Sequence, residues 1–176
     1  LDRGGIVGED GVTNHGVFDM TAFGAVPGLT IAAPMDELEL RNMMYTGLQY
    51  GHPFMIRYPR GNGAGRLWRG VPFEALPVGR GRRLREGTDV ALVTVGTVGN
   101  AAARAAERAA EKGVSVAHYD LRFAKPLDEA LLAEVGAKFR HVVTVEDGSL
   151  RGGVGEAVTA FFNARGCEVA VHSLGI

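Results

Sequence analysis

The strongest constraint on the fold is an alternation of short apolar runs and helical segments over residues 88–176. Each apolar run is rich in valine and short enough to be a strand, and the segments between the runs carry alanine, leucine and charged residues at helical spacing. Turn residues such as Gly113 and Pro126 separate the two kinds of segment. Strands that alternate with helices across short loops predict a largely parallel sheet that is covered on both faces. The expected strands are 90–95, 114–120, 141–145 and 168–174, and the expected helices are 100–112, 127–139 and 155–164.

The first part of the chain repeats this architecture on a smaller scale. Apolar runs at 29–33 and 54–58 predict strands, and residues 36–50 place leucine and methionine near helical spacing. Asp36 is the expected N-cap of that helix, and Gly51 is its expected terminator. Strand, helix and strand of this length form a βαβ unit. Because two strands make a small sheet and the last residues fall on a strand end, we expect both ends of the chain to continue in a longer protein.

A stretch between the two units, residues 64–87, is rich in glycine and arginine and has no sustained period. This composition is typical of a linker or an extended crossing segment. We therefore expect residues 1–63 to be the C-terminal part of one domain and residues 88–176 to be a second domain. The predicted fold class is α/β, with two three-layer α/β/α units whose sheets are largely parallel.

The overall charge excludes a general affinity for anionic surfaces. Nineteen lysines and arginines against 20 aspartates and glutamates give a formal net charge of −1, so no field of one sign recruits nucleic acid or a membrane surface. Any anion-binding site must therefore be local. The single cysteine, Cys167, excludes an internal disulfide framework, and no run has the length of a membrane span or the pattern of a signal peptide. These features predict a cytoplasmic protein without a nucleic-acid or membrane partner.

Residues 1–20 form a polar, glycine-rich stretch without a helical period. Glycines in such a loop permit left-handed turns that bring side chains close to a ligand. A surface turn with solvated charges has the same composition, so composition alone leaves both interpretations open. The candidate ligand-binding residues are Asp2, Arg3, Glu9, Asp10, Asn14 and His15.

Two arginines, Arg57 and Arg60, lie where the second expected strand ends. Parallel sheets present their ligands at this end, and a guanidinium group suits phosphate or carboxylate. Arginines also flank strands for solubility, so this motif alone leaves its role open.

The segment 146–155 follows an expected strand and precedes an expected helix, as a phosphate-binding loop does. It lacks the third glycine of the dinucleotide pattern and the lysine of a P-loop, so we favour a structural turn. The histidines on expected strands are more typical of structural residues than of ligands, and their spacing predicts no metal site. These histidines are His118, His141 and His172.

Six motifs spread along the chain are informative when they are taken together. They are DRGGIVGEDG (2–11), GVFD (16–19), AP (33–34), RYPRG (57–61), LRFAKPLD (121–128), and VEDG with GGVG (145–155). In combination they resemble the 1-deoxy-D-xylulose-5-phosphate synthases, a transketolase-like family that depends on thiamine diphosphate. The resemblance implies the later part of the pyrimidine-binding domain and most of the C-terminal domain of a homodimeric enzyme. It also implies Mg²⁺ as a second cofactor, and a reaction that condenses pyruvate with D-glyceraldehyde 3-phosphate and releases CO₂.

The resemblance assigns roles to three residues at matching positions and leaves two candidates for a fourth role. Arg3 and Arg60 match the pair that grips the phosphate of the aldehyde substrate, and Asp10 matches an aspartate that contacts substrate hydroxyls. A histidine is expected four positions after Asp10, where this chain has Asn14 followed by His15. An amide cannot shuttle a proton near neutral pH whereas an imidazole can. Both residues are therefore candidates for the role of the expected histidine.

The resemblance also implies that part of the active site lies outside this chain. The Gly-Asp-Gly motif that binds Mg²⁺ and the cofactor's diphosphate belongs upstream of Leu1, as does the glutamate that activates the cofactor's pyrimidine ring. We therefore expect the chain alone to be inactive. One alternative is the β subunit of an oxo-acid dehydrogenase or of a split transketolase, and a dehydrogenase would not need the arginine pair. The other is a non-catalytic dimerisation module, which Asn14 favours.

Overall fold

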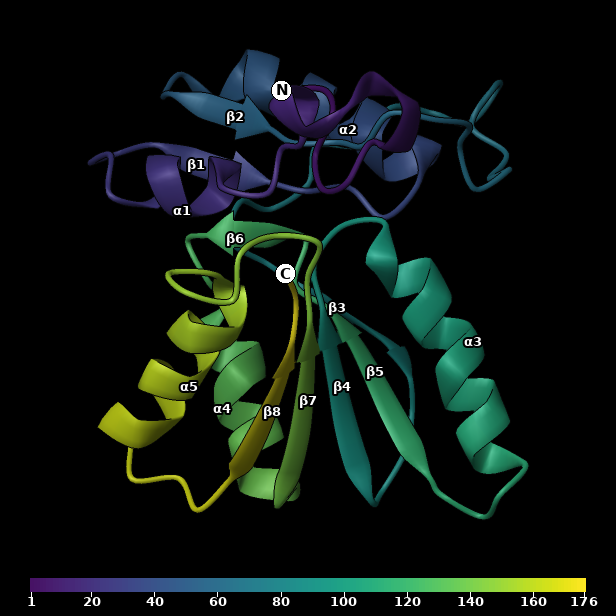
Figure 1. Cartoon of the computed structure of the whole chain (residues 1–176), viewed down its shortest axis with the longest axis vertical. Coiled ribbons are helices and arrows are strands. Elements are labelled where there is room, and N and C mark those ends of the chain that lie inside the picture. The colour runs from purple at the N-terminus through teal and green to yellow at the C-terminus, as the bar shows by residue number, and fades with distance from the viewer.

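A computed structural model describes all residues, 1–176. The chain forms a small unit from its first part and a larger α/β unit from its second part, and the small unit lies across one end of the larger sheet (Figure 1). No helix combines the length and the apolar character needed to span a membrane. Two single 3₁₀ turns, Gly8–Asp10 and Val12–Asn14, come first and are followed by α1 (Asp19–Gly24), β1 (Thr30–Ala32), α2 (Glu37–Tyr50), β2 (Phe54–Ile56), β3 (Arg82–Arg85), β4 (Val90–Thr94), α3 (Val98–Ala110), β5 (Val116–Asp120), β6 (Phe123–Lys125), α4 (Glu129–Lys138), β7 (His141–Val145), α5 (Val154–Ala164) and β8 (Ala170–Leu174).

The larger sheet has the strand order β3-β5-β4-β7-β8. Strands β5, β4, β7 and β8 are parallel, and β3 pairs with β5 in antiparallel fashion. Helix α3 covers one face and helices α4 and α5 cover the other (Figure 1). The predicted three-layer, largely parallel arrangement of this unit is confirmed. The core on the α4 and α5 side includes Val93, Val95, Leu132, Val135, Val158 and Phe162, all of them buried.

The predicted ends of α2 agree with the structure. The Asp36 carboxylate accepts a hydrogen bond from the Glu39 N–H at 2.9 Å, so Asp36 is the N-cap of α2. Gly51 follows the last turn with φ of 71°, a left-handed conformation that glycine adopts at little cost. Asp128 caps α4 in the same way, because its carboxylate accepts from the Leu131 N–H at 3.0 Å.

The smaller sheet contains a strand that the sequence did not predict. Its order is β2-β1-β6, and β6 belongs to the second part of the chain. β1 and β2 are parallel, as expected for a βαβ unit, whereas β6 pairs with β1 in antiparallel fashion. A three-residue strand shows no period, and its partner lies far away in sequence, which is why pattern analysis missed it. The two units therefore share a sheet.

The segment predicted as a linker, 64–87, is not wholly irregular. Its last part is β3, which completes the larger sheet at one edge. The sequence of β3, RRLR, carries no apolar alternation because an edge strand with charged side chains is only half covered. Earlier in the segment, the Arg41 guanidinium of α2 donates to the carbonyls of Trp68, Val71 and Pro72 at 2.6, 2.8 and 2.8 Å. The segment therefore follows a defined path across α2.

A buried group of charged residues joins the two units. Glu39 of α2 is 3% exposed and accepts from Arg82 at 2.9 Å and from Arg122 at 2.7 Å. Arg82 also pairs with Asp120 at 3.0 Å. Burial raises the pKa of Asp120 to about 6, although the Arg82 charge opposes that shift. Because each carboxylate has an arginine partner, the interface carries no uncompensated charge.

Candidate functional site

The opening segment, residues 1–20, is not an open surface loop, because it folds back on itself. The Gly16 N–H donates to the Arg3 carbonyl, and the Gly5 N–H donates to the Gly16 carbonyl, both at 3.0 Å. The Gly4 N–H donates to the Tyr58 carbonyl at 2.9 Å, which ties the segment to the stretch after β2. A Cβ on Gly16 would overlap the Arg3 carbonyl, so only glycine permits this approach. The prediction of a segment without helical structure was incomplete, since it contains two 3₁₀ turns and its last residues begin α1.

The structure brings Arg3, Asp10 and Arg60 together. The Asp10 Oδ2 atom lies 2.8 Å from Arg3 Nε and 3.1 Å from Arg60 Nε. Arg3 Nη1 also pairs with Asp2 Oδ2 at 2.9 Å. The hydrogen bond with Asp10 is the main cause that raises the pKa of Arg3 above its ordinary value. Residues at positions 3, 10 and 60 of the chain therefore form one charged cluster.

The arginine pair in this cluster keeps donors free for a ligand. The Arg3 and Arg60 side chains are 42% and 47% exposed, and Asp10 between them is 18% exposed. Arg60 uses only its Nε atom within the chain, and the Nη2 atom of Arg3 has no partner. A guanidinium group presents paired N–H donors in a fixed plane that matches phosphate oxygens. Arg3 and Arg60 therefore keep N–H donors that are free to bind an anion beside Asp10.

The two candidates for the expected histidine differ in their environment. The His15 Nδ1 atom accepts a hydrogen bond from the Val7 N–H at 3.2 Å, so the proton of the neutral ring is on Nε2. The Asn14 amide is exposed and donates to the Asp10 carbonyl at 2.6 Å. Both residues line a cavity of about 440 Å³ together with Leu1, Asp2, Arg3, Thr13, Gly16, Phe18, Asp19, Ala22 and Phe23.

The two arginines that follow β2 have different surroundings. Arg60 is exposed beside Asp10, whereas the Arg57 side chain is 2% exposed. Arg57 Nε lies 2.7 Å from Asp19 Oδ2, and its Nη1 pairs with Asp147. Arg57 is therefore unavailable to a ligand. Their position at a strand end did not distinguish these residues, whereas the family resemblance assigned only Arg60 to the phosphate.

The glycine-rich turn at 146–155 is structural, as predicted. The Glu146 carboxylate, which is buried, accepts from the N–H groups of Val154 at 3.0 Å and Gly155 at 2.8 Å. These are the first N–H groups of α5, the groups that would bind a phosphate. Burial is the main cause that raises the pKa of Glu146, and the two backbone N–H groups oppose the rise. The protein's own carboxylate therefore occupies the helix N-terminus.

Of the histidines on strands, His118 is placed as a structural residue. His118 is 1% exposed, and its Nε2 lies 2.9 Å from Thr94 Oγ1. Burial lowers the pKa of His118 to about 4, so the ring is neutral near pH 7. His141 and His172 lie at exposed positions of β7 and β8. No group of three or more histidine, cysteine, aspartate or glutamate side chains is arranged to hold a metal ion.

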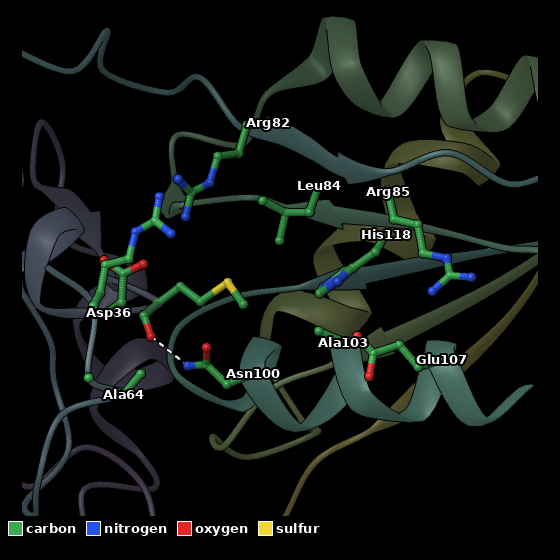
Figure 2. A pocket seen from close by; sticks show the side chains of 12 residues that line it. Asp36, Ala64, Arg82, Leu84, Arg85, Asn100, Ala103, Glu107 and His118 are labelled. Atoms are coloured by element: carbon green, nitrogen blue, oxygen red, sulfur yellow. Dashed lines mark hydrogen bonds between the residues drawn. The ribbon is translucent and has the colours of Figure 1, made fainter. Parts of the chain in front are cut away.

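A cavity of about 640 Å³ does not contain the predicted site residues. It lies between α3, the β3–β5 edge and residues 64–66, and Figure 2 shows Arg82, Arg85, Glu107 and His118 around it. Its lining includes three arginines and two carboxylates, and Arg82 is already paired with Glu39 and Asp120. With charges of both signs, the lining selects no ligand of one sign. We therefore take the arginine pair, and not this cavity, as the candidate site.

Comparison with known proteins relates both parts of the chain to transketolases. Residues 1–65 match the model of the transketolase pyrimidine binding domain, and residues 79–176 match that of the transketolase C-terminal domain. The whole chain aligns with 27% of the length of the 1-deoxy-D-xylulose-5-phosphate synthase of Bacteroides fragilis, and 56% of the aligned residues are identical. It is also 44% identical to 28% of the synthase of Carboxydothermus hydrogenoformans. The chain thus spans little more than a quarter of these curated relatives.

A solved structure supports the same relationship at the level of the fold. The protein described as "Split gene transketolase, inactive beta4 tetramer" aligns with all of this chain and with 56% of its own chain. The TM-score is 0.86 and the sequence identity is 26%. The family resemblance inferred from the motifs is therefore confirmed over both units.

Proposed function

The chain belongs to the transketolase family, and from this premise we propose that it is part of a 1-deoxy-D-xylulose-5-phosphate synthase. The whole enzyme would condense pyruvate with D-glyceraldehyde 3-phosphate, releasing CO₂ and forming 1-deoxy-D-xylulose 5-phosphate. The observation that carries the proposal is the convergence of Arg3 and Arg60 on Asp10. This chain would supply the part of the site that binds the aldehyde substrate.

The arginine pair has the chemistry that a phosphorylated acceptor requires. A phosphate dianion between two guanidinium groups forms charge-assisted hydrogen bonds with both. When the phosphate at one end of the substrate is bound, the carbonyl at the other end is restricted to a small region of the site. This restriction orients the acceptor carbonyl toward its reaction partner and reduces the entropic part of the barrier.

Asp10 is suited to recognise the hydroxyl group of the acceptor. Its Oδ2 atom holds both arginines, while its Oδ1 atom has no partner within the chain. A carboxylate oxygen of this kind accepts a hydrogen bond from a substrate hydroxyl. Asp10 would therefore both hold the guanidinium groups in place before binding and contact the substrate afterwards.

His15 and Asn14 would divide the role of the histidine that the resemblance leads one to expect. His15 carries its proton on Nε2 while Nδ1 accepts from the Val7 N–H, so the ring can donate one hydrogen bond to a substrate oxygen. Asn14, held by the Asp10 carbonyl, would keep the turn in shape. To take up a proton at Nδ1, His15 would first have to release the Val7 N–H.

Thiamine diphosphate would supply the reactive carbanion when it is bound in the whole enzyme. The side chains of this chain do not make a metal-binding group, and the family's Mg²⁺ and diphosphate residues would come from elsewhere in the protein. We accordingly expect the 176-residue chain to be inactive alone. The whole enzyme would act as a homodimer.

A second candidate is one chain of a split transketolase. It is favoured by the fold likeness to a protein described as a split gene transketolase. In that case a separate chain would supply the remaining domain. The arginine pair also suits phosphorylated sugars in general, so the acceptor alone does not separate the two candidates.

The test is to express the complete polypeptide that contains this chain and to supply it with pyruvate, glyceraldehyde 3-phosphate, thiamine diphosphate and Mg²⁺. We expect the product to carry five carbons and one phosphate, with one CO₂ released per turnover. Failure to decarboxylate pyruvate, together with ketol transfer from a phosphorylated ketose once the separately encoded chain is added, would support the split transketolase instead. A protein inactive in both assays, with and without that second chain, would support the non-catalytic module.

A further inference from the structure

We propose that Arg57 and Asp147 are positioning residues that set the affinity of the Arg3–Arg60 site for a phosphate-bearing substrate. This inference rests on the proposed function, because it concerns the same site. Neither residue is expected to touch the substrate, since Arg57 is buried beneath the opening segment and Asp147 belongs to the loop after β7. Their effect would pass through the backbone that carries Arg3.

Every arm of the Arg57 guanidinium has a partner. Nε donates to Asp19 Oδ2 at 2.7 Å, and Nη1 donates to the Asp147 carboxylate. Nη2 donates to the carbonyls of Gly16 at 3.1 Å and Asp147 at 3.2 Å. The side chain is 2% exposed, so these are hydrogen bonds in a region with little water. Arg57 thus links α1, the opening segment and the second unit.

The bond to Gly16 leads directly to Arg3. The Gly16 N–H donates to the Arg3 carbonyl at 3.0 Å. Arg3 has a φ of 63°, a left-handed conformation that costs a non-glycine residue on the order of 1 kcal/mol. Such a conformation persists only where its surroundings hold it. Gly4 packs directly on Arg57, because a Cβ there would lie 3.0 Å from Arg57 Cζ. The position of Arg57 therefore determines where the Arg3 side chain begins.

Asp147 fixes this arrangement from the second unit. A Cβ on Gly5 would lie 2.8 Å from Asp147 Oδ2, so the carboxylate packs against the opening segment. The neighbouring Ser149 N–H donates to the Val17 carbonyl at 2.9 Å. The opening segment therefore packs on the loop after β7.

Asp147 lies at the end of the larger sheet where parallel sheets usually bind ligands. The chain leaves β4 toward β5 on one side and later returns to β7 on the other, so the strand order reverses between β4 and β7. Open parallel sheets usually bind ligands in the crevice at such a reversal. Here Arg57 lies in that crevice, with its Nη1 atom 4.0 Å from the Cβ position of Gly96, just beyond β4. A side chain of the other unit therefore lies at this crevice.

The consequence is that the second unit positions Arg3, one of the two arginines proposed to bind the phosphate. Arg3 depends on the link from Asp147 through Arg57 and Gly16, whereas Arg60, three residues after Arg57, has no hydrogen bond to this link and pairs with Asp10. Loss of the Asp147 charge should therefore loosen Arg3 and leave Arg60 in place. Pyruvate has no phosphate, so its binding should not change.

The experiment compares three variants of the complete protein with the wild type. Asp147→Asn removes the charge and keeps the shape, and Arg57→Lys keeps the charge but cannot span three partners. Asp19→Asn removes a carboxylate from the same arginine without affecting the second unit. Glu168→Gln is a remote control, because Glu168 is 83% exposed and pairs only with Arg140. Binding of glycerol 3-phosphate, which has the phosphate but no aldehyde, is measured by calorimetry alongside the KM values of both substrates.

We expect Asp147→Asn and Arg57→Lys to weaken glycerol 3-phosphate binding about tenfold, a change equivalent to about 1.4 kcal/mol. The KM for glyceraldehyde 3-phosphate should rise by the same factor, with the KM for pyruvate within twofold of wild type. Asp19→Asn should change binding less than threefold, and Glu168→Gln should not change it.

A merely structural role would lower the melting temperature without this split between the substrates. Unchanged binding in folded Asp147→Asn or Arg57→Lys would overturn the proposal, and so would an equal loss in Asp19→Asn. If Asp147→Asn does not fold, Arg57→Lys decides the matter. A wild type that binds glycerol 3-phosphate but forms no 1-deoxy-D-xylulose 5-phosphate would refute the proposed reaction. The binding measurements would still test the positioning role of Arg57 and Asp147.

Discussion

Replacement of Arg60 by alanine is the most direct test of the phosphate grip. Arg60 Nε lies 3.1 Å from Asp10, and the Nη atoms have no partner in the chain. Asp10 retains Arg3 at 2.8 Å when Arg60 is removed, so the opening segment should keep its shape. The variant therefore removes donors from the site with little effect on the fold.

The expected magnitude follows from the donors that are lost. Two charge-assisted hydrogen bonds to phosphate are available from the Nη atoms, each worth about 1.5 kcal/mol or more. Because the Arg60 side chain is 47% exposed, water screens part of this energy. A loss of about 2 kcal/mol corresponds to a rise of about 30-fold in the KM for glyceraldehyde 3-phosphate. Arg60→Lys keeps the charge but not the planar pair of donors, so its KM should lie between those of wild type and Arg60→Ala.

The assay measures initial rates of 1-deoxy-D-xylulose 5-phosphate formation with each substrate varied in turn. Arg165→Ala is a matched control, because the Arg165 side chain is 50% exposed and pairs with Glu129. The pyruvate KM should stay within twofold of wild type in all variants. Equal increases in the KM of both substrates, or no increase for the aldehyde, would refute the assignment of Arg60 to the phosphate.

Three further outcomes are expected. His118 has a pKa of about 4 in the folded protein against an ordinary value of 6.5. The free energy of unfolding should therefore be unaffected by this group above pH 6.5 and fall by roughly 3 kcal/mol as the pH drops to 4. His118→Gln should make the decline in melting temperature over this pH range shallower. Glu39→Gln should destabilise the protein by about 3 kcal/mol in denaturant titrations, because it leaves Arg82 and Arg122 without their shared carboxylate, whereas Glu168→Gln should have no effect. His15→Ala should lower kcat at least tenfold and Asn14→Ala should lower it less; the reverse order would assign the catalytic role to Asn14.

Much of both units could be predicted because the signals are local. The apolar runs of β4, β5 and β7 and the cap residues Asp36 and Gly51 depend on neighbours within one or two turns of chain. Helix bounds shifted by only a few residues, as for α3, which begins at Val98 where residue 100 was expected. The fold class and the family therefore follow from pattern and motif alone.

Strands β3 and β6 could not be predicted, for a common reason. β3 consists of RRLR and β6 of FAK, and neither has a period that marks a strand. Each is a strand because a partner from a distant part of the chain offers free backbone groups, β5 for β3 and β1 for β6. Backbone hydrogen bonds with distant partners leave no trace in local sequence.

The amino-acid order alone determined that this chain is an α/β protein of the transketolase family with arginines near a strand end, because periodicity, caps and motifs are properties of adjacent residues. Only the folded arrangement decided which arginine is buried and which is exposed. Arg57 and Arg60 are three positions apart, yet Arg57 is buried by carboxylates that lie 38 and 90 residues away, while Arg60 remains exposed beside Asp10. The burial of a charge depends on which distant partners the fold brings to it, and that is settled only when the two units pack together.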